Sequence, residues 1–264
     1  MICRIDSKIS RDICSAHQPN LFPYLGIWEK YWMSDVFVWA DDMQFTSGDF
    51  QQRFEIVANS GVVKYSIPLK KHKLGMPINQ VSLAEGWRDV LIGAIRGSFC
   101  KSERADKICD FIAGIYPSSL SDLTLCVIHW LLYNEAIFGK RTMPGLVLSS
   151  VLGNKYSCDS TINSATDCIR ADCEALGCNV YLAGKSARRY LEMDRMEKVA
   201  VLFQNFHPNS FKYAQRYSRE EFKPYMSCLD AYLNEADLSS MADEWERQKE
   251  EVKRTGHCGL WETA

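Results

Sequence analysis

Apolar positions along the chain follow two different spacings, and these predict strands and helices in alternation. Short apolar-leaning runs occur at 13–16, 36–40, 178–184 and 199–206, and each predicts a strand. Longer segments with helical spacing lie between these runs. Strands that alternate with helices predict an α/β fold, with a Rossmann-like parallel or mixed sheet flanked by helices.

Helices are expected where apolar residues recur at helical spacing between capping and breaking residues. Pro23 suits the first turn of a helix, and Gly177 suits a helix end. From residue 84 to 138 the pattern is helical, so we expect a helical middle segment. The predicted helices cover residues 24–33, 88–115, 121–138, 160–176, 186–198, 224–235 and 240–254.

Three shorter features add to the sheet prediction. The stretch "FEIVANSGVVKYSIPL" has two strand-like runs around Asn59, Ser60 and Gly61, which is typical of a hairpin. The stretch "MPGLVLSSVLG" predicts one more strand. A strand, a helix and a second strand within about 28 residues imply a parallel pair with a right-handed crossover.

Size and charge narrow the class of protein. With 264 residues, 47% of them hydrophobic, the chain can form one large core, and we expect a single domain over 1–264. The net charge of −2, without a long basic run, argues against a nucleic-acid partner. No apolar run approaches the ~18 residues of a membrane span. The N-terminal stretch "MICRIDSKISRD" lacks the apolar segment of a signal peptide, so we expect a cytoplasmic protein without a membrane partner.

Eleven cysteines are scattered along the chain, and reduced thiols are the simplest interpretation. The densest group is Cys168, Cys173 and Cys178, at intervals of five residues. Zinc ligands favour intervals of two to four, and five residues turn a helix by about 140°, so these thiols would not share one face. Buried free cysteines are therefore favoured over a metal site, and no metal ligand is predicted.

Two polar clusters follow the first two predicted strands. His17, Gln18 and Asn20 lie in "SAHQPNLFPYLG", and "DVFVWADDMQF" ends in two aspartates and a glutamine. If the strands are parallel, both clusters converge on one sheet edge, where α/β proteins bind ligands. The competing interpretation is that these side chains only cap a helix and a turn. The residues of the second cluster are Asp41, Asp42 and Gln44.

Three further positions are candidates for substrate binding. Arg53, in "FQQRFEI", is suited to bind a carboxylate or phosphate through two hydrogen bonds, or to form a structural ion pair with the aspartates. In "YLAGKSARRYL" a strand ends at Gly184 and a helix follows, so backbone amides and Ser186 are placed to bind an anion. Simple helix capping is the alternative for Ser186.

A third constellation lies near the C-terminus. On a helix beginning at Pro224, the side chains of Ser227, Asp230 and Asn234 form one polar stripe beside an apolar face, and Gln215 lies upstream in a loop. The stripe is expected to hold a ligand or to position the opening loop. The alternative interpretation is that the stripe only marks the boundary between the core and solvent.

Familiar catalytic signatures are missing from the sequence. It contains no GxSxG, GxGxxG, GxxxxGK[ST] or HExxH motif. Cys126 and His129 are three residues apart on a predicted helix, so a nucleophilic pair is conceivable. A hydrogen-bonded core histidine is the favoured interpretation of His129.

Together these segments resemble the WbqC-like protein family. The resemblance rests on "HQPNLFPYLG", "SDVFVWADDMQF", "QQRFEI", "YSIPL", "YLAGKSARRYL" and "FKPYMSCLDAYLN", in order, over residues 13–235. Residues 236–264 lie beyond it as a helical C-terminal extension. The family's recurring polar positions match His17, Gln18, Pro19, Asp41, Asp42, Gln44, Arg53, Gly184, Ser227 and Asp230.

The resemblance implies a role in modifying an activated metabolite. The family is associated with bacterial O-antigen and other surface-polysaccharide gene clusters, which implies a sugar nucleotide or similar substrate and an amide-forming acyl or aminoacyl transfer. This chain departs from the family at Tyr24, where tryptophan is frequent, at Thr46 and Ser47, and at Gln52, where asparagine is usual. The departures at Thr46, Ser47 and Gln52 are expected to affect which substrate is accepted.

A looser likeness gives an alternative. The order of strand, polar loop, helix and strand is similar to the first unit of nucleotidylyl transferases and pantothenate-synthetase-type ligases. Those enzymes carry His-x-Gly-His on the first loop, whereas this chain has His17 alone. The alternative is an ATP-dependent adenylating ligase, which would require ATP and magnesium.

The favoured hypothesis is a transferase with a small-molecule substrate and, conceivably, a carrier-bound donor. His17, Asp41 or Asp42 would be the general base, because each can take a proton from an attacking amine or hydroxyl. Arg53 would bind an anionic group, while Gln18, Gln44 and Asp230 would orient the acceptor. No required cofactor is evident. A third hypothesis is a non-catalytic scaffold, whose interface the seven tryptophans would supply. The oligomeric state is left open.

Overall fold

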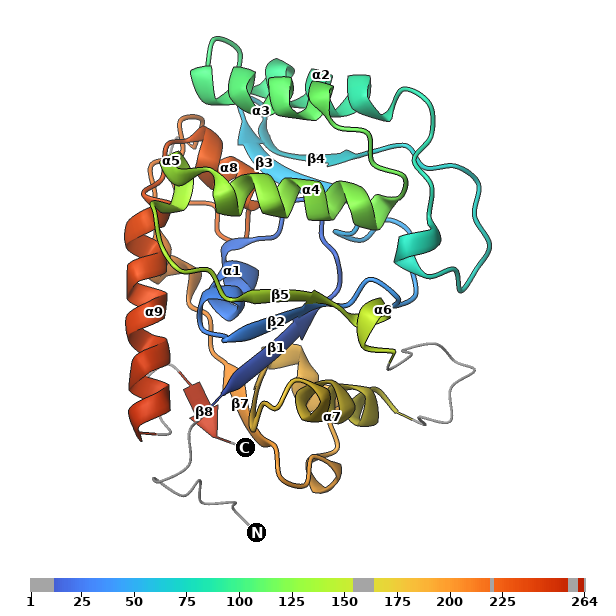
Figure 1. The fold of residues 1–264 in the computed structure, drawn as a ribbon. Helices are drawn as coiled ribbons and strands as arrows, with labels where there is room; N and C mark the ends of the chain where they lie inside the picture. The colour runs from blue at the N-terminus through green and yellow to red at the C-terminus, as the bar shows by residue number, and fades with distance from the viewer. Residues whose placement is uncertain (1–11, 154–163, 219–220, 256–260, 264) are drawn as a thin grey trace.

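A six-stranded sheet forms the centre of the molecule (Figure 1). The computed structural model describes residues 12–153, 164–218, 221–255 and 261–263. The strand order is β5-β2-β1-β6-β7-β8, with five parallel strands and an antiparallel β8 at one edge. The strands are β1 (Ile13–His17), β2 (Val36–Trp39), β5 (Gly145–Leu148), β6 (Val180–Ala183), β7 (Ala200–Gln204) and β8 (Trp261–Thr263), with β3 (Arg53–Ala58) and β4 (Gly61–Ser66) in a separate antiparallel hairpin.

The chain order reverses at the centre of this sheet. From β1 the chain passes to β2 and β5 on one side, and later to β6 and β7 on the other. β1 and β2 are parallel, and His17 lies opposite Trp39. β1 also pairs in parallel with β6, where Ser15 lies opposite Leu182. The reversal between β1 and β6 is the position where open α/β sheets bind ligands. The predicted α/β class, with a Rossmann-like mixed sheet, is therefore confirmed.

Successive residues of each strand enter different cores, because side chains alternate across a strand. In β2, Phe37 and Trp39 belong to the larger core cluster, and Val38 belongs to the smaller one. In β6, Leu182 belongs to the larger cluster and Tyr181 belongs to the smaller one. The sheet is therefore buried on both faces, which explains its almost continuous apolar strands.

Helices cover both faces (Figure 1). α1, α4 and α9 pack on the face that carries the larger core, and α7 packs on the opposite face. All eight residues of α1 are buried, so it is an internal helix. The described helices are α1 (Leu25–Trp32), α2 (Trp87–Ser98), α3 (Glu103–Gly114), α4 (Leu120–Tyr133), α5 (Glu135–Phe138), α6 (Ser149–Leu152), α7 (Ala165–Ala175), α8 (Cys228–Leu233) and α9 (Leu238–Thr255), with 3₁₀ turns η1 (Ile78–Gln80), η2 (Lys185–Arg189), η3 (Met193–Arg195) and η4 (Pro208–Phe211).

The helical middle segment is confirmed, but the single helix predicted over 88–115 is wrong. It is divided into α2 and α3 at Lys101, which has a positive φ of 61°. Ser102 then starts a new helix, since its hydroxyl accepts a hydrogen bond from the backbone N–H of Ala105. The helix predicted over 121–138 likewise ends at Tyr133, and α5 follows after Asn134.

The helix predicted over 186–198 is also wrong, because this segment forms only the 3₁₀ turns η2 and η3. Between them the backbone N–H of Glu192 donates 3.0 Å to the hydroxyl of Thr166 on α7. A tertiary hydrogen bond therefore holds the chain where a helix would have continued.

The helix predicted from Pro224 begins four residues later, at Cys228. Tyr225 has a positive φ of 63°, which a continuous helix does not allow. Ser227 is the N-cap of α8, and its N–H and hydroxyl both donate to the carbonyl oxygen of Glu55, at 3.0 and 2.9 Å. Tertiary bonds to β3 thus fix the start of the helix.

Two further segments predicted to be helical, 160–176 and 236–264, agree with the structure in part. Residues 160–163 of the helix predicted over 160–176 lie outside the described residues, and the rest corresponds to α7. The C-terminal extension contains α9 as expected but also β8, so it is not wholly helical. Within the described ranges, no helix combines the length and apolar character that crossing a membrane requires.

Candidate functional site

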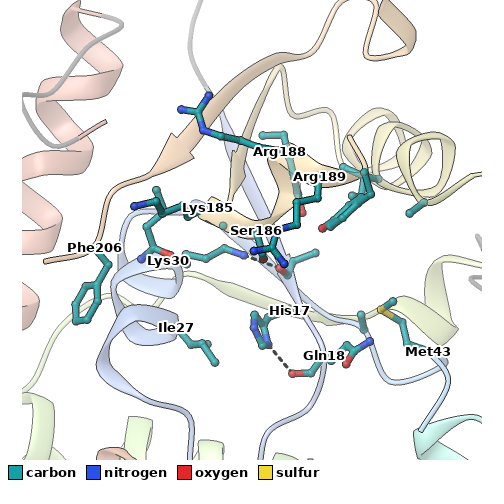
Figure 2. A pocket seen from close by; sticks show the side chains of 18 of the residues that line it. His17, Gln18, Ile27, Lys30, Met43, Lys185, Ser186, Arg188, Arg189 and Phe206 are labelled. Carbon is teal, nitrogen blue, oxygen red and sulfur yellow. Dashed lines mark hydrogen bonds between the residues drawn. The ribbon is translucent and has the colours of Figure 1, made fainter. Parts of the chain in front are cut away.

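A cavity of about 950 Å³ opens at the carboxyl ends of the parallel strands (Figure 2). Its walls come from the ends of β1, β2, β6 and β7, from the helices α1 and α7, and from the turn η2. It therefore lies at the reversal between β1 and β6. Of the predicted site residues, it brings together four: His17, Gln18, Gly184 and Ser186.

His17 ends β1 and lies on the cavity wall as a neutral imidazole. Burial, followed by the positive charge of Lys30, lowers the pKa of His17 to about 4. Nδ1 lies 2.8 Å from the carbonyl oxygen of Gln18 (Figure 2). Because a carbonyl only accepts, Nδ1 carries the ring proton and Nε2 keeps its lone pair. The geometry thus prepares Nε2 to accept a proton or a hydrogen bond.

Lys30 of α1 reaches the same cavity from the helix side. Its side chain is buried, and Nζ donates 2.7 Å to the carbonyl oxygen of Ala16 (Figure 2). Burial lowers the pKa of Lys30 to about 8. The described residues give it no carboxylate within ion-pair distance, so its charge is balanced mainly by backbone dipoles.

The outer wall of the cavity is basic. Lys185, Arg188 and Arg189 lie on η2 and are exposed, and the guanidinium of Arg188 lies 4.0 Å from the ring centre of Phe203. With Lys30, four cationic side chains line the cavity, and no described lining residue is an aspartate or glutamate. This imbalance favours an anionic ligand.

Aromatic side chains line another part of the cavity. Tyr24, Phe206 and Tyr225 form a cluster with ring centres 5.8 to 6.4 Å apart. Tyr225 is 57% exposed and has φ 63°, so the backbone holds an aromatic ring at the entrance in an uncommon conformation. Rings in this arrangement can stack on a sugar or a base.

The segment before Tyr225 is held by a buried network around Asp230. The Asp230 carboxylate accepts hydrogen bonds from the Tyr213 hydroxyl at 2.6 Å, Gln215 at 3.1 Å and the Val57 N–H at 2.7 Å. Burial raises the pKa of Asp230, and these donors oppose that effect. Gln215 also bonds both backbone groups of Lys223, at 2.9 and 2.7 Å. Asp230, Gln215 and the N-cap Ser227 thus lie outside the cavity lining and support the segment that leads to Tyr225.

Asp41 and Asp42 meet the opening loop at one edge, as the parallel pairing predicts, but neither lines the cavity. Asp41 is buried and accepts hydrogen bonds from the Ser149 hydroxyl at 3.2 Å, and from both the N–H and hydroxyl of Ser150. Asp42 accepts from the Ser149 hydroxyl. These contacts join the end of β2 to α6.

The remaining predicted residues lie around the opening loop. Gln18 is positioned by the side-chain amide of Gln51 at 2.7 Å. Asn20 is buried and Gln44 is exposed, and both are outside the cavity lining. Arg53 lies 4.8 Å from the ring centre of Phe50, and its Nε is buried without a hydrogen-bond partner. Among the described residues, no ion pair links Arg53 to the aspartates.

Glu29 lies beside the cavity on α1. Gln204, which lines the cavity, donates 3.0 Å to the Glu29 carboxyl and 2.6 Å to the carbonyl oxygen of Gly26. Burial raises the pKa of Glu29 to about 7, although the bond from Gln204 lowers it. At neutral pH the Glu29 carboxyl is therefore about half protonated and half ionised.

Other chemical candidates lie elsewhere. His129 is exposed on α4 and contacts Tyr133 edge-to-face, so the core position expected for it is wrong. Neither it nor Cys126 lines the cavity. Cys168, Cys173 and Cys178 are buried. In the part of the chain that the structure describes, no group of three metal-ligating side chains occurs.

The cavity contains residues that the sequence patterns did not identify, chiefly Lys30 and the basic side chains of η2. One signal was available for Lys30, because it is a charged residue inside the aromatic helix "YLGIWEKYWM". The helix predicted over 186–198 gives no reason to expect the cations of "KSARR" in one cavity, since this segment forms the 3₁₀ turn η2 instead.

Comparison with known proteins agrees with this description. The model of the WbqC-like protein family matches residues 18–240, most of the chain. An uncharacterized protein of Mycobacterium tuberculosis is 24% identical over 225 residues, which cover 82% of this chain and 91% of that protein. The name of that protein states no function, so a function for this chain has to be inferred from the chemistry of the cavity.

Proposed function

The chain belongs to the WbqC-like protein family, and we propose that it is a transferase that modifies a small activated metabolite with a negatively charged group. The substrate class that fits best is a sugar nucleotide or a similar phosphorylated compound. The reaction is amide formation, in which an activated acyl or aminoacyl donor reacts with an amine. Such metabolites belong to the cytoplasm, the location that the sequence predicts.

The charge of the cavity lining carries this proposal. Lys30, Lys185 and Arg189 line a space in which the described lining has no carboxylate, and the Arg188 guanidinium on the same wall lies over the ring of Phe203. Arginine and lysine bind phosphate through charge-assisted hydrogen bonds. The overall charge of the chain is −2, so this basic concentration is local and not a general property of the surface.

Size and shape support a nucleotide-like ligand. A volume of about 950 Å³ is at the upper end of the range for small-molecule sites, roughly 300–1,000 Å³. Tyr24, Phe206 and Tyr225 offer ring faces or edges at one part of the cavity. The ligand would place its ring system there and its phosphate groups near η2.

His17 is suited to the proton transfer that amide formation needs. In the proposed step the acceptor nitrogen attacks the acyl carbon, the bond to the leaving group breaks, and Nε2 takes the proton lost by nitrogen. The leaving group departs with the bonding electron pair. A bound anion would favour the imidazolium form and raise the low pKa of His17 toward the working pH.

Ligand binding is the first test. Titration of nucleotide sugars and their diphosphates by calorimetry should give binding that Arg189→Ala weakens at least about fivefold, the effect of losing roughly 1 kcal/mol of charge-assisted contact. Lys107→Ala on α3 is the matched control, because it removes a positive charge outside the cavity. Equal affinity of both variants and the native protein would contradict the proposal.

An ATP-dependent ligase is a second candidate, because the same basic wall also suits a triphosphate. It differs in requiring ATP and magnesium and in releasing pyrophosphate when the substrate is adenylated. Isotope exchange between pyrophosphate and ATP distinguishes the two: exchange supports the ligase, and acyl transfer from a preformed thioester or acyl phosphate without ATP supports the transferase.

The scaffold hypothesis expects tryptophan side chains on the surface. Trp28, Trp32, Trp39 and Trp245 are among the largest fully buried side chains and stabilise the core. They are therefore unavailable as an interface for a partner.

A further inference from the structure

We propose that Lys30 is an imine-forming lysine, and that the cavity accepts an anionic substrate which also carries an aldehyde or ketone group. The inference rests on the proposed function for the anionic part of the substrate. The covalent step at Lys30 is additional to it and can be tested separately.

The first argument is the position of Lys30. It is only 4% exposed, yet it lines the cavity, so its amine faces the ligand space and not bulk water. Figure 2 shows its side chain extending from α1 into the cavity, with Nζ bonded to Ala16. An ammonium has three N–H donors, and this bond uses one. The amine therefore keeps donor capacity on the wall of a cavity that can receive a ligand group.

The second argument is the unusual environment of the charge. Buried lysines are ordinarily paired with carboxylates, because removing an isolated charge from water is costly. Here the described neighbours supply no such pair, and the remaining charged groups of the lining are cations. An environment of this kind favours the neutral amine, which is the nucleophilic form. Burial accordingly lowers the pKa of Lys30 to about 8.

The third argument is the arrangement of the other functional groups. The cations of η2 form the outer wall, whereas Lys30 approaches from α1, on the side of the sheet ends. A substrate held by its phosphate at η2 would thus present a different group to Lys30. His17 lines the same cavity, and its Nε2 can accept the proton that leaves the attacking nitrogen.

The chemical step balances without a further reactant. The Nζ lone pair attacks the carbonyl carbon, and the carbonyl electron pair moves to oxygen. Nitrogen loses one proton to Nε2 of His17, which passes it to this oxygen to give the carbinolamine. The nitrogen lone pair then forms the carbon–nitrogen double bond as the hydroxyl group leaves, and this group departs as water with the second nitrogen proton. One amine and one carbonyl therefore give one imine and one water, with no oxidation or reduction.

The probe for this proposal is pyridoxal 5′-phosphate, which combines an aldehyde, an aromatic ring and a phosphate. The purified full chain is incubated with the probe and cyanoborohydride, and each lysine is then quantified by peptide mass spectrometry. Lys30 should be modified at lower probe concentration than exposed lysines such as Lys185 and Lys107. Modification of the exposed lysines with Lys30 unchanged overturns the proposal.

Two variants serve as controls for the labelling experiment. Lys30→Arg keeps a cation but cannot form the imine, so it should lose the modification at this site while its circular dichroism spectrum stays native. Lys107→Arg, on α3 outside the cavity, should leave modification of Lys30 within about twofold. If Lys30→Arg does not fold, the native protein still decides the question, because its labelled peptides are mapped directly.

A neutral aldehyde separates the covalent step from anion binding. If pyrophosphate slows labelling by pyridoxal phosphate and Lys30 is the labelled residue, both proposals are supported. If a small neutral aldehyde labels Lys30 but pyrophosphate has no effect on either probe, the imine proposal holds and the anionic substrate fails. If anions bind and neither probe labels Lys30, the imine proposal fails alone.

Discussion

Ser150 binds the carboxylate of Asp41 with both its backbone N–H, at 3.0 Å, and its hydroxyl, at 2.8 Å. The side-chain amide of Asn79 is a further donor, at 3.2 Å. The aspartate thus joins the end of β2 to α6 and to η1, three segments that are distant in sequence. Its position suggests a structural role for one of the two adjacent aspartates.

Asp41→Asn should therefore destabilise the protein. The amide replaces an acceptor oxygen with a donor, which leaves buried donors unsatisfied and costs about 2 kcal/mol. Chemical denaturation of the native protein and the variant measures this difference. An unfolding free energy unchanged within about 0.5 kcal/mol would contradict the structural role.

Asp42→Asn tests the catalytic role predicted for the neighbouring residue. Asp42 is partly exposed, so the substitution should preserve the fold. If the Asp42 carboxylate acts as a base, turnover should fall by about 10²-fold while ligand affinity changes little. Full turnover in the folded variant would remove Asp42 from the catalytic residues.

Glu29 should give the protein a measurable pH dependence. Its pKa is about 7 when folded and near its ordinary 4.5 when unfolded, so the folded state binds more protons between these values. The unfolding free energy contributed by Glu29 therefore decreases as pH rises from about 4.5 to 7, by roughly 3 kcal/mol. In Glu29→Gln this contribution should be absent. The difference between the two proteins across pH, measured by denaturation, checks the sign and size.

Asp230→Ala should be among the most damaging substitutions. It removes the acceptor for three buried donors, one of them the backbone of Val57, and should cost at least about 3 kcal/mol. Asp110→Ala, at an exposed carboxylate on α3, serves as the control. Loss of stability below 1 kcal/mol in Asp230→Ala would show that the network can rearrange.

Tyr225→Asn separates the aromatic contact from the backbone conformation. Asparagine tolerates a positive φ, so the fold should be retained. Loss of one stacking ring should weaken a nucleotide-like ligand by about fivefold, or roughly 1 kcal/mol. Calorimetry with nucleotide diphosphates measures the change. A diphosphate without an aromatic base should be affected much less, and equal losses for both ligands would argue against stacking.

Local patterns were sufficient where the structure depends on nearby residues. The approach of His17 to the end of β2 follows from one short crossover, and the sequence predicts it. Lys30 and Arg189 line the same cavity only because β1 pairs with β6, although more than 160 residues of chain separate the two strands. No local periodicity encodes that pairing. Contacts with β3 and with the Asp230 network likewise fix the positions of Tyr225 and Ser227. The start predicted for this helix, at Pro224, is therefore four residues too early.

The pairing of β1 with β6 also determines when the cavity can exist during synthesis. At about 5–20 residues per second, β6 leaves the ribosome some 10–30 s after β1. Until then the inner edge of β1, an apolar strand at the sheet centre, has no neighbour on that side. The nascent chain therefore carries an unpaired edge for most of its synthesis, which makes β1 the segment where chaperones would bind and aggregation would begin. Slowing translation after residue 153 should lower the yield of folded protein more than slowing it after residue 204.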